Sequence, residues 1–134
     1  MSRSSITSFS ALWRAYSEGR IERSLDLVDP ACELVMLGGD RTYVGRDGVR
    51  EWLADVRRDW QTLMVSYDTV DEPYDGCVIG SGRITASSTD GGRTLEGTLV
   101  CVAQFSGGRL LRGRAFLDRE AAERYAGALR ASEA

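Results

Sequence analysis

Apolar residues recur every three or four positions over the first twenty residues of the chain, which is the period of one helix face. Gly19 follows this stretch and supplies a residue that can end a helix in the left-handed conformation. The pattern therefore predicts a helix that ends just before Gly19. The face that we expect this helix to bury carries Ile6, Phe9, Leu12, Trp13 and Tyr16.

The next part of the chain predicts two more helical segments with two short strands between them. Asp29-Pro30 ends the first of these segments, because proline disfavours the helical conformation in the residue before it. The turn Gly38-Gly39-Asp40 separates the strands, and Gly45 to Gly48 opens the next helix. The expected elements are a helical turn over 21–28, strands over 32–37 and 41–44, and a helix over 49–58.

The second half of the chain is rich in strand-forming residues, with glycine-containing turns between the runs. Asp118 stands where the N-cap of a short final helix belongs. Long antiparallel strands and three N-terminal helical segments predict an α+β cone, with a strongly curved, mainly antiparallel sheet around the helices, in one domain spanning residues 1–134. The expected strands cover 63–70, 77–88, 94–105 and 110–117, and the expected helix covers 119–130.

Strand alternation predicts which side chains face the helices. The inner face should carry small and apolar residues, here Leu99, Cys101, Ala103 and Phe105 on one strand and Leu111, Gly113, Ala115 and Leu117 on the next. The outer face should carry Val100, Val102, Leu110 and Phe116 beside Arg112 and Arg114. Because that outer face is too apolar to lie in water, we expect a homodimer through it.

Charge and composition exclude several classes of protein. The net charge of −3 argues against nucleic acid as a partner, and no apolar run approaches the ~20 residues of a membrane span. The odd number of cysteines in apolar runs predicts free thiols in a cytoplasmic protein. The chain contains no histidine, which excludes His-based catalysis and His-rich metal sites, and we expect neither a metal nor a cofactor.

Four short motifs lie at the boundaries of the predicted elements: Tyr16-Ser-Glu-Gly19, Leu27-Val-Asp-Pro-Ala31, Thr42-Tyr-Val-Gly-Arg-Asp-Gly-Val49 and Phe116-Leu-Asp-Arg-Glu-Ala-Ala122. With the order of the elements, they resemble the nuclear transport factor 2-like superfamily, most closely its SnoaL-like and ketosteroid-isomerase-like branch. The resemblance covers about residues 8–127 and implies a cone whose mouth is a ligand pocket. It does not select an activity, since the superfamily holds isomerases, cyclases, dehydratases, epoxide hydrolases and non-enzymatic binders.

The functional positions of the ketosteroid isomerases are not matched. The resemblance places their catalytic base on Met36, their oxyanion-binding acid on Cys101 and their first-helix tyrosine on Leu12. Steroid-isomerase chemistry is therefore not expected. The remaining catalytic candidates are Tyr16, whose alternative role is core packing, and Asp40, whose alternative role is that of a solvated turn residue.

Two hypotheses follow for the function. One is a SnoaL-like isomerase, cyclase or dehydratase of a hydrophobic, ring-containing metabolite, and the other is a non-catalytic ligand-binding or dimerisation module. In both, the ligand should be apolar and uncharged or weakly polar, because no inner-face position offers an arginine or a carboxylate. The expected pocket comprises Trp13, Tyr16, Met36, Trp52, Leu99, Cys101, Ala103, Gly113, Ala115 and Leu117.

Overall fold

The computed structural model describes residues 4–36 and 41–133, which form three α-helices, one 3₁₀ helix and six strands in one mixed sheet. The strand order is β2-β1-β6-β5-β4-β3, with β1 parallel to β6 and every other pair antiparallel. The elements are α1 (Ser5–Ser17), η1 (Ile21–Leu27), β1 (Val28–Val35), β2 (Thr42–Val44), α2 (Gly45–Asp59), β3 (Trp60–Tyr74), β4 (Cys77–Ser88), β5 (Thr94–Ser106), β6 (Arg109–Phe116) and α3 (Arg119–Glu133).

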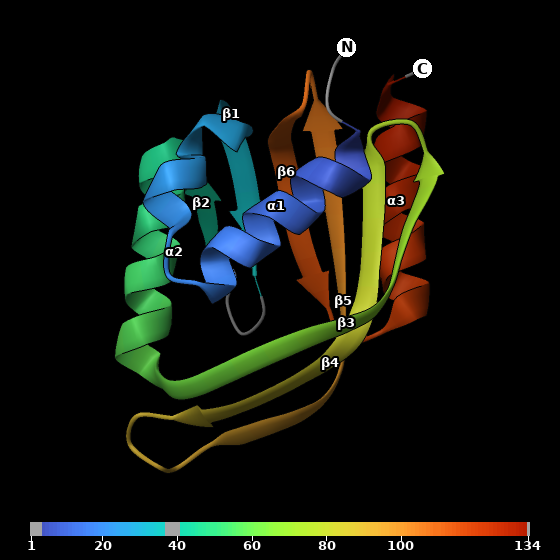
Figure 1. Ribbon diagram of the computed structural model, residues 1–134. Coiled ribbons are helices and arrows are strands. Elements are labelled where there is room, and N and C mark those ends of the chain that lie inside the picture. Colours follow the sequence, from blue (N-terminus) through green and yellow to red (C-terminus); the bar gives the residue numbers. More distant parts are fainter. Residues whose placement is uncertain (1–3, 37–40, 134) are drawn as a thin grey trace.

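This architecture confirms the predicted α+β cone. Figure 1 shows α1 and α2 on one side of the sheet and α3 on the other, while β3 and β4 bend so that their ends pass beneath α1. None of the helices in the described ranges is long and apolar enough to cross a membrane.

The boundaries of α1 follow from capping. The Ser4 side chain accepts a hydrogen bond from the backbone N–H of Thr7 at 3.2 Å, which satisfies one free donor of the first turn. Gly19 has a φ of 71°, as predicted for the residue that ends the helix. Asp118 also acts as predicted, because its carboxylate accepts from the backbone N–H of Glu120 at 3.1 Å where α3 begins.

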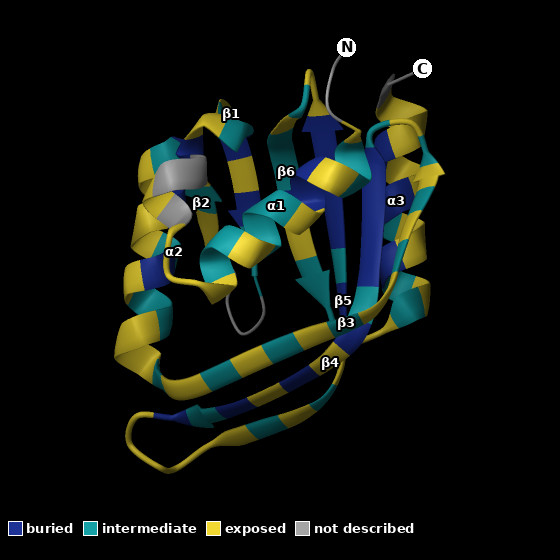
Figure 2. Ribbon diagram, viewed as in Figure 1, coloured by how far each residue is buried: buried dark blue, intermediate teal, exposed yellow. Residues whose placement is uncertain are grey.

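Apolar side chains fill both faces of the sheet. Figure 2 shows the buried residues concentrated along β4 and β5, which lie between α1 and α3. On the inner face, Phe9 of α1 packs with Val78, Ala103 and Phe105. On the outer face, α3 packs against Cys77, Ile79, Val100 and Val102 through Ala122, Ala126 and Leu129.

The role of α3 corrects the sequence analysis. Val100 and Val102 are 0% exposed, because α3 covers the outer face that was expected to be open. Phe116 also packs beside Tyr125 of this helix, with ring centroids 5.5 Å apart. The helix is not short but 15 residues long, and it removes the exposed apolar surface from which the homodimer was inferred.

A β-bulge corrects the predicted faces of β6. Gln104 pairs with Arg112 and Phe105 pairs with Leu110, so Leu111 is an extra residue without a partner on β5. Beyond the bulge the alternation is reversed, and Leu110 rather than Leu111 joins the inner face. Strict alternation had assigned these two leucines the other way round.

Candidate functional site

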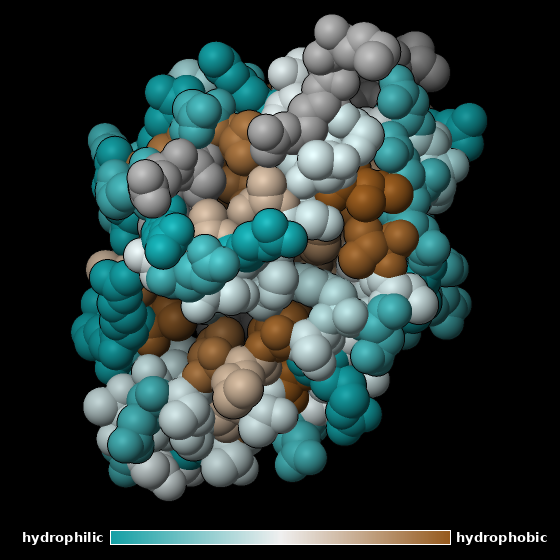
Figure 3. All heavy atoms as spheres, in the orientation of Figure 1, coloured by the Kyte–Doolittle hydropathy of each residue, from teal (hydrophilic) through white to brown (hydrophobic). Residues whose placement is uncertain are grey.

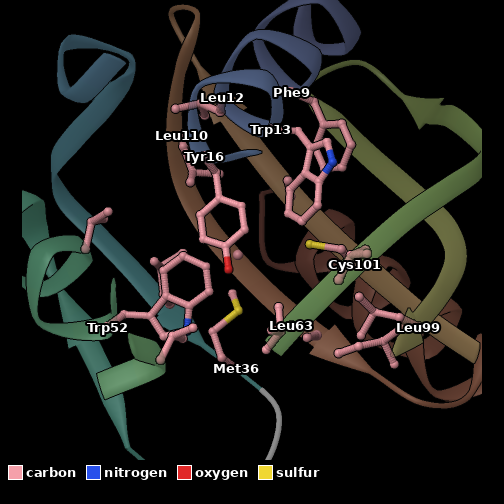
Figure 4. Close-up of a pocket in the computed structure, with 18 of the residues that line it drawn as sticks. Phe9, Leu12, Trp13, Tyr16, Met36, Trp52, Leu63, Leu99, Cys101 and Leu110 are labelled. Carbon is pink, nitrogen blue, oxygen red and sulfur yellow. The ribbon is translucent and has the colours of Figure 1, made fainter. Parts of the chain in front are cut away.

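A cavity of about 190 Å³ lies between the helices α1 and α2 and the inner face of the sheet. Every element from α1 to β6 except η1 and β2 contributes to its wall (Figure 4). The lining residues are Phe9, Leu12, Trp13, Tyr16, Val28, Leu34, Met36, Val49, Trp52, Val56, Trp60, Leu63, Val65, Tyr67, Ile84, Leu95, Leu99, Cys101, Ala103, Phe105, Leu110, Gly113 and Ala115.

The cavity exists because large side chains on the helices face small ones on the sheet. Cys101 pairs with Ala115 and Ala103 pairs with Gly113 on neighbouring strands, so four small residues form one patch of the inner face. Opposite them lie the aromatic side chains of α1 and α2 that line the same cavity. Natural cores are close-packed, so a void of this size is a departure from ordinary packing.

Nine of the ten residues expected to form the pocket line this cavity. The exception is Leu117, which follows the end of β6 and is 54% exposed. It had been placed on the inner face by extending the alternation of β6 by one residue, but the strand ends at Phe116. Whether the other nine contact a ligand stays a prediction.

Five aromatic rings, four from α1 and α2 and one from β3, form a continuous wall of the cavity. Neighbouring ring centroids lie 5.4 Å apart for Trp52 and Tyr16, 5.0 Å for Tyr16 and Trp13, 5.0 Å for Trp13 and Tyr67, and 5.3 Å for Tyr67 and Phe9. The Trp52 and Tyr16 rings are stacked at 20°, whereas Tyr67 meets both of its neighbours edge-on. Edge-on contacts of this kind hold each ring in one orientation.

Tyr16 directs its hydroxyl group into the cavity. In Figure 4 its ring extends from α1, and the oxygen points toward Met36. No partner for this hydroxyl is found among the described residues, and it is not sealed from solvent. Burial raises the pKa of Tyr16, while the positive charge of Arg57 lowers it by a smaller amount, so the hydroxyl remains protonated and can donate a hydrogen bond at neutral pH.

Tyr67 is a site residue that the sequence analysis did not identify. Its hydroxyl donates a hydrogen bond to the Cys101 thiol, and burial raises the pKa of Tyr67 far above its usual value. Leu63, Val65 and Tyr67 alternate along β3 and all line the cavity. This alternation is visible in the sequence, but the faces of this strand had not been assigned.

Cys101 is a protonated thiol on the cavity wall. Burial raises its pKa to about 11, which outweighs the lowering effect of the hydrogen bond from Tyr67. A thiol in this state is a poor nucleophile at neutral pH. Cys32 and Cys77 are also free, and both are buried.

No carboxylate lines the described part of the cavity. Asp40, the second catalytic candidate, lies outside the described residues. Met36, Cys101 and Leu12, which stand at the functional positions of the ketosteroid isomerases, all line the wall without an acidic group among them. Within residues 4–36 and 41–133 no cluster of His, Cys, Asp and Glu side chains could hold a metal ion.

A polar network closes the side of the molecule next to the cavity. The Tyr43 hydroxyl donates to the Asp55 carboxylate at 2.6 Å, and Arg41 and Arg58 form ion pairs with the same carboxylate at 3.1 Å and 3.0 Å. These contacts lower the pKa of Asp55, mainly through the hydrogen bond from Tyr43. The network joins β2 to α2, the helix that carries Trp52 and Val56, and so fixes one wall of the cavity.

The comparisons with known proteins rest on structure. No family model matches the sequence, and no curated protein matches it. An NTF2-like protein from Burkholderia thailandensis is 20% identical, with a TM-score of 0.77 over 87% of this chain and 92% of that chain. A putative SnoaL-like polyketide cyclase from Jannaschia is 15% identical, with a TM-score of 0.66 over 87% and 88%.

A third solved structure of similar fold contains a bound small molecule. It is a hypothetical protein with a ketosteroid-isomerase-like fold from Catenulispora acidiphila, in complex with trimethylamine. It is 11% identical, with a TM-score of 0.68 over 89% of this chain and 88% of that chain. Likeness at these identities shows the fold alone, and the fold is that of NTF2-like, SnoaL-like and ketosteroid-isomerase-like proteins, as the sequence motifs predicted.

Proposed function

We propose that the protein binds a ring-containing, largely apolar small molecule in the cavity between α1, α2 and the sheet. The observation that carries the proposal is a cavity of about 190 Å³ with an aromatic wall on one side and small residues on the other. Flat apolar molecules fit such a space, because aromatic faces provide a large contact area with defined geometry.

The volume sets the size of the ligand. An engineered cavity of roughly 150 Å³ lined by aliphatic and aromatic residues binds benzene. The cavity here is larger, at about 190 Å³, which favours one substituted ring or two fused rings. A charged group within the wall is disfavoured, because the described lining residues include neither a carboxylate nor an arginine to pair with it.

The Tyr16 hydroxyl provides a hydrogen-bond donor in the cavity wall. This hydroxyl has no partner among the described residues, whereas the Tyr67 proton is already donated to Cys101. A ligand with a carbonyl oxygen near Tyr16 would satisfy this donor, and the rest of the molecule would contact apolar side chains. The part of the proposed ligand inside the wall is therefore an uncharged ring system that carries a hydrogen-bond acceptor.

Catalysis is the second candidate function, and it rests on the same hydroxyl. A tyrosine that donates to a carbonyl oxygen stabilises negative charge developing there, which is the role of an oxyanion donor in an isomerase, cyclase or dehydratase. Such a reaction also needs a base, and the described lining contains none. Ligand binding without turnover is therefore the function that the geometry supports best.

The test uses two ligands that differ only in the acceptor, 1-tetralone and tetralin, titrated by isothermal calorimetry. Wild-type protein should bind the ketone more tightly by about 2- to 10-fold, which is the range for one neutral hydrogen bond. Tyr16→Phe should remove this preference and leave the affinity for tetralin unchanged.

Tyr67→Phe is the matched control, since it removes a hydroxyl from the same wall whose proton is already used. It should keep the preference for the ketone. Trimethylamine, the molecule bound by the neighbour from Catenulispora, should not bind, because none of the described lining residues is a carboxylate that can pair with an ammonium group. Failure of both bicyclic ligands to bind would contradict the proposal.

Assembly and location stay predictions. A homodimer through the outer face would have to use the part of the sheet that α3 leaves open, where Glu33 and Arg114 are exposed and Arg112 is half-buried. Such an interface would be polar rather than apolar. A cytoplasmic location and a single domain over residues 1–134 are likewise predictions from the sequence.

A further inference from the structure

One end of the cavity is less buried than the other. Phe105 and Ala103 at the inner end are 6% and 3% exposed, whereas Val56, Trp60, Leu63 and Leu95 are only half-buried. Figure 3 shows hydrophobic side chains at the surface in the band between α1 and β3. The mouth of the cavity therefore lies where the end of α2 meets the start of β3, beside the turn between β4 and β5.

Arg57 is a cation beside this mouth that forms no ion pair with any described residue. It follows Val56, which lines the cavity, and its side chain is exposed. Its positive charge lowers the pKa of Tyr16, on the opposite helix, so the guanidinium lies within electrostatic reach of the hydroxyl that points into the cavity. Among the described residues no acidic group lies within ion-pair distance of Arg57, although its neighbour Arg58 contacts both Asp55 and Asp59.

Arg93 is a second cation at the same mouth. Its guanidinium carbon lies 5.4 Å from the centre of the Trp60 ring, another lining residue. A guanidinium that lies over an aromatic face keeps the N–H groups at its edge available for an oxyanion. The described acidic residues form no ion pair with it within 4.0 Å.

The turn that carries Arg93 is fixed to the end of α2. The backbone N–H of Thr89 donates to the Asp59 carbonyl at 3.0 Å, and the Thr89 hydroxyl donates to the Arg58 carbonyl at 2.8 Å. Arg93 itself is held by a hydrogen bond from its N–H to the Ser88 hydroxyl at 2.9 Å. The two arginines thus lie on segments that are joined directly.

The nearby carboxylates already have hydrogen-bond or ion-pair partners, and the charge of Arg93 also acts on Asp90. Asp59 pairs with Arg58 at 3.1 Å, and Asp90 accepts from the Ser88 hydroxyl at 2.6 Å and from the Gly92 N–H at 2.8 Å. Within the described residues, neither Arg57 nor Arg93 forms an ion pair within 4.0 Å, so the N–H groups of both guanidiniums are available to a ligand at the apolar opening. An arginine is suited to a carboxylate or a similar anionic group, because its N–H groups bind two oxygens at once.

We propose that the ligand is an amphipathic anion, with its ring inside the cavity and an acidic group held at the mouth by Arg57 and Arg93. This inference rests on the proposed function. It adds that the part of the ligand outside the apolar wall carries a negative charge. The ring stays in uncharged surroundings, and the anionic group stays partly in water, so no unpaired charge is buried.

The experiment compares 1-naphthylacetate with its neutral amide, 1-naphthylacetamide, by calorimetry at low and at high salt. Wild-type protein should bind the anion about 10-fold more tightly than the amide at low salt, as for a charge-assisted hydrogen bond. High salt should weaken binding of the anion and not of the amide, because the mouth is exposed to solvent.

The variants Arg57→Gln and Arg93→Gln should each weaken binding of the anion by about 5-fold, the upper range for an exposed ion pair. Neither variant should change binding of the amide, which reports an intact cavity. Arg109→Gln is the matched control, since it removes one exposed arginine at the start of β6, which pairs with the far end of β5.

The outcomes separate this inference from the proposed function. If the amide binds and the anion binds no more tightly, the role of the arginines is overturned while the cavity remains a binding site. An equal loss of anion affinity in Arg109→Gln would also overturn it, because overall charge would then explain the effect. If neither molecule binds, the proposed function fails together with the inference.

Discussion

At the scale of single residues, alternation along a strand predicted much of the cavity wall. Leu99, Cys101 and Ala103 were assigned to the inner face from period-two spacing alone, and all three line the cavity. The spacing failed at Leu110, because a bulge adds one residue to β6 and reverses the faces beyond it. A bulge depends on the pairing of two strands, so the sequence of one strand does not reveal it.

The ion-pair partners of the arginines could not be predicted from the sequence either. Arg57 and Arg58 are adjacent and chemically identical, yet Arg58 pairs with Asp55 and Asp59 while Arg57 has no ion pair among the described residues. The difference arises from the direction of each side chain on α2. Only the folded arrangement shows which arginine remains available for a ligand.

Gly80 offers a test of how tightly the aromatic wall is packed. A Cβ at this position would lie 2.9 Å from Phe9 and 3.0 Å from the Tyr67 ring, closer than van der Waals contact. Gly80→Ala should therefore lower the free energy of unfolding by about 1–3 kcal/mol, as in other overpacked cores, measured by urea denaturation.

Gly97→Ala is the control for this change. Gly97 lies on β5 next to Leu95 and Leu99, but a Cβ there meets nothing within 4 Å. This variant should be neutral or stabilising by about 0.4–1 kcal/mol, because alanine restricts the unfolded chain. Equal effects of the two substitutions would contradict the packing described around Tyr67.

At the scale of the elements, the sequence predicted the order of helices and strands but not the partner of the final helix. The motif around Asp118 indicated where α3 begins, and its N-cap is confirmed. The sequence predicted the apolar outer face of β5, but a second copy of the chain was expected to bury it. The structure assigns it to α3, because a neighbouring segment of the same chain is always present at high local concentration.

The substitution Ala122→Asp tests the packing of α3. Ala122 is 0% exposed and packs with the valines of β5, so an aspartate would place an unpaired charge in an apolar contact. The free energy of unfolding should fall by about 3–5 kcal/mol, as for other uncompensated buried charges, in the same denaturation assay. If α3 did not pack on the sheet in solution, the loss would be small.

Ala128→Asp provides the comparison on the exposed face of α3. An acidic residue near the C-terminal end of a helix is unfavourable by only about 0.3–1 kcal/mol. The difference in unfolding free energy between the two aspartate variants therefore measures the effect of burial against the sheet, because both variants change the helix propensity in the same way.

At the scale of the whole molecule, four boundary motifs were enough to predict the cone, because a turn, a cap and a helix end fix where each element begins and ends. The cavity follows from the cone when small residues on β5 and β6 face aromatic residues on α1 and α2. The nature of the ligand does not follow from the fold, since the same scaffold serves several activities. It has to be inferred from the wall, the Tyr16 hydroxyl and the two arginines at the mouth.

The central claim is that the space above Ala115 is a ligand site, and filling it tests this claim most directly. Ala115→Trp places a large ring inside the cavity, whereas Leu117→Trp places the same ring two residues away on a position that is already 54% exposed. Binding of 1-tetralone to both variants would be measured by isothermal calorimetry, with their unfolding free energies measured alongside.

Ala115→Trp should abolish binding of 1-tetralone, with a change in stability within about 1–3 kcal/mol, and Leu117→Trp should bind it as wild-type protein does. The account would be contradicted if Ala115→Trp kept both the affinity and the stability of the wild-type protein.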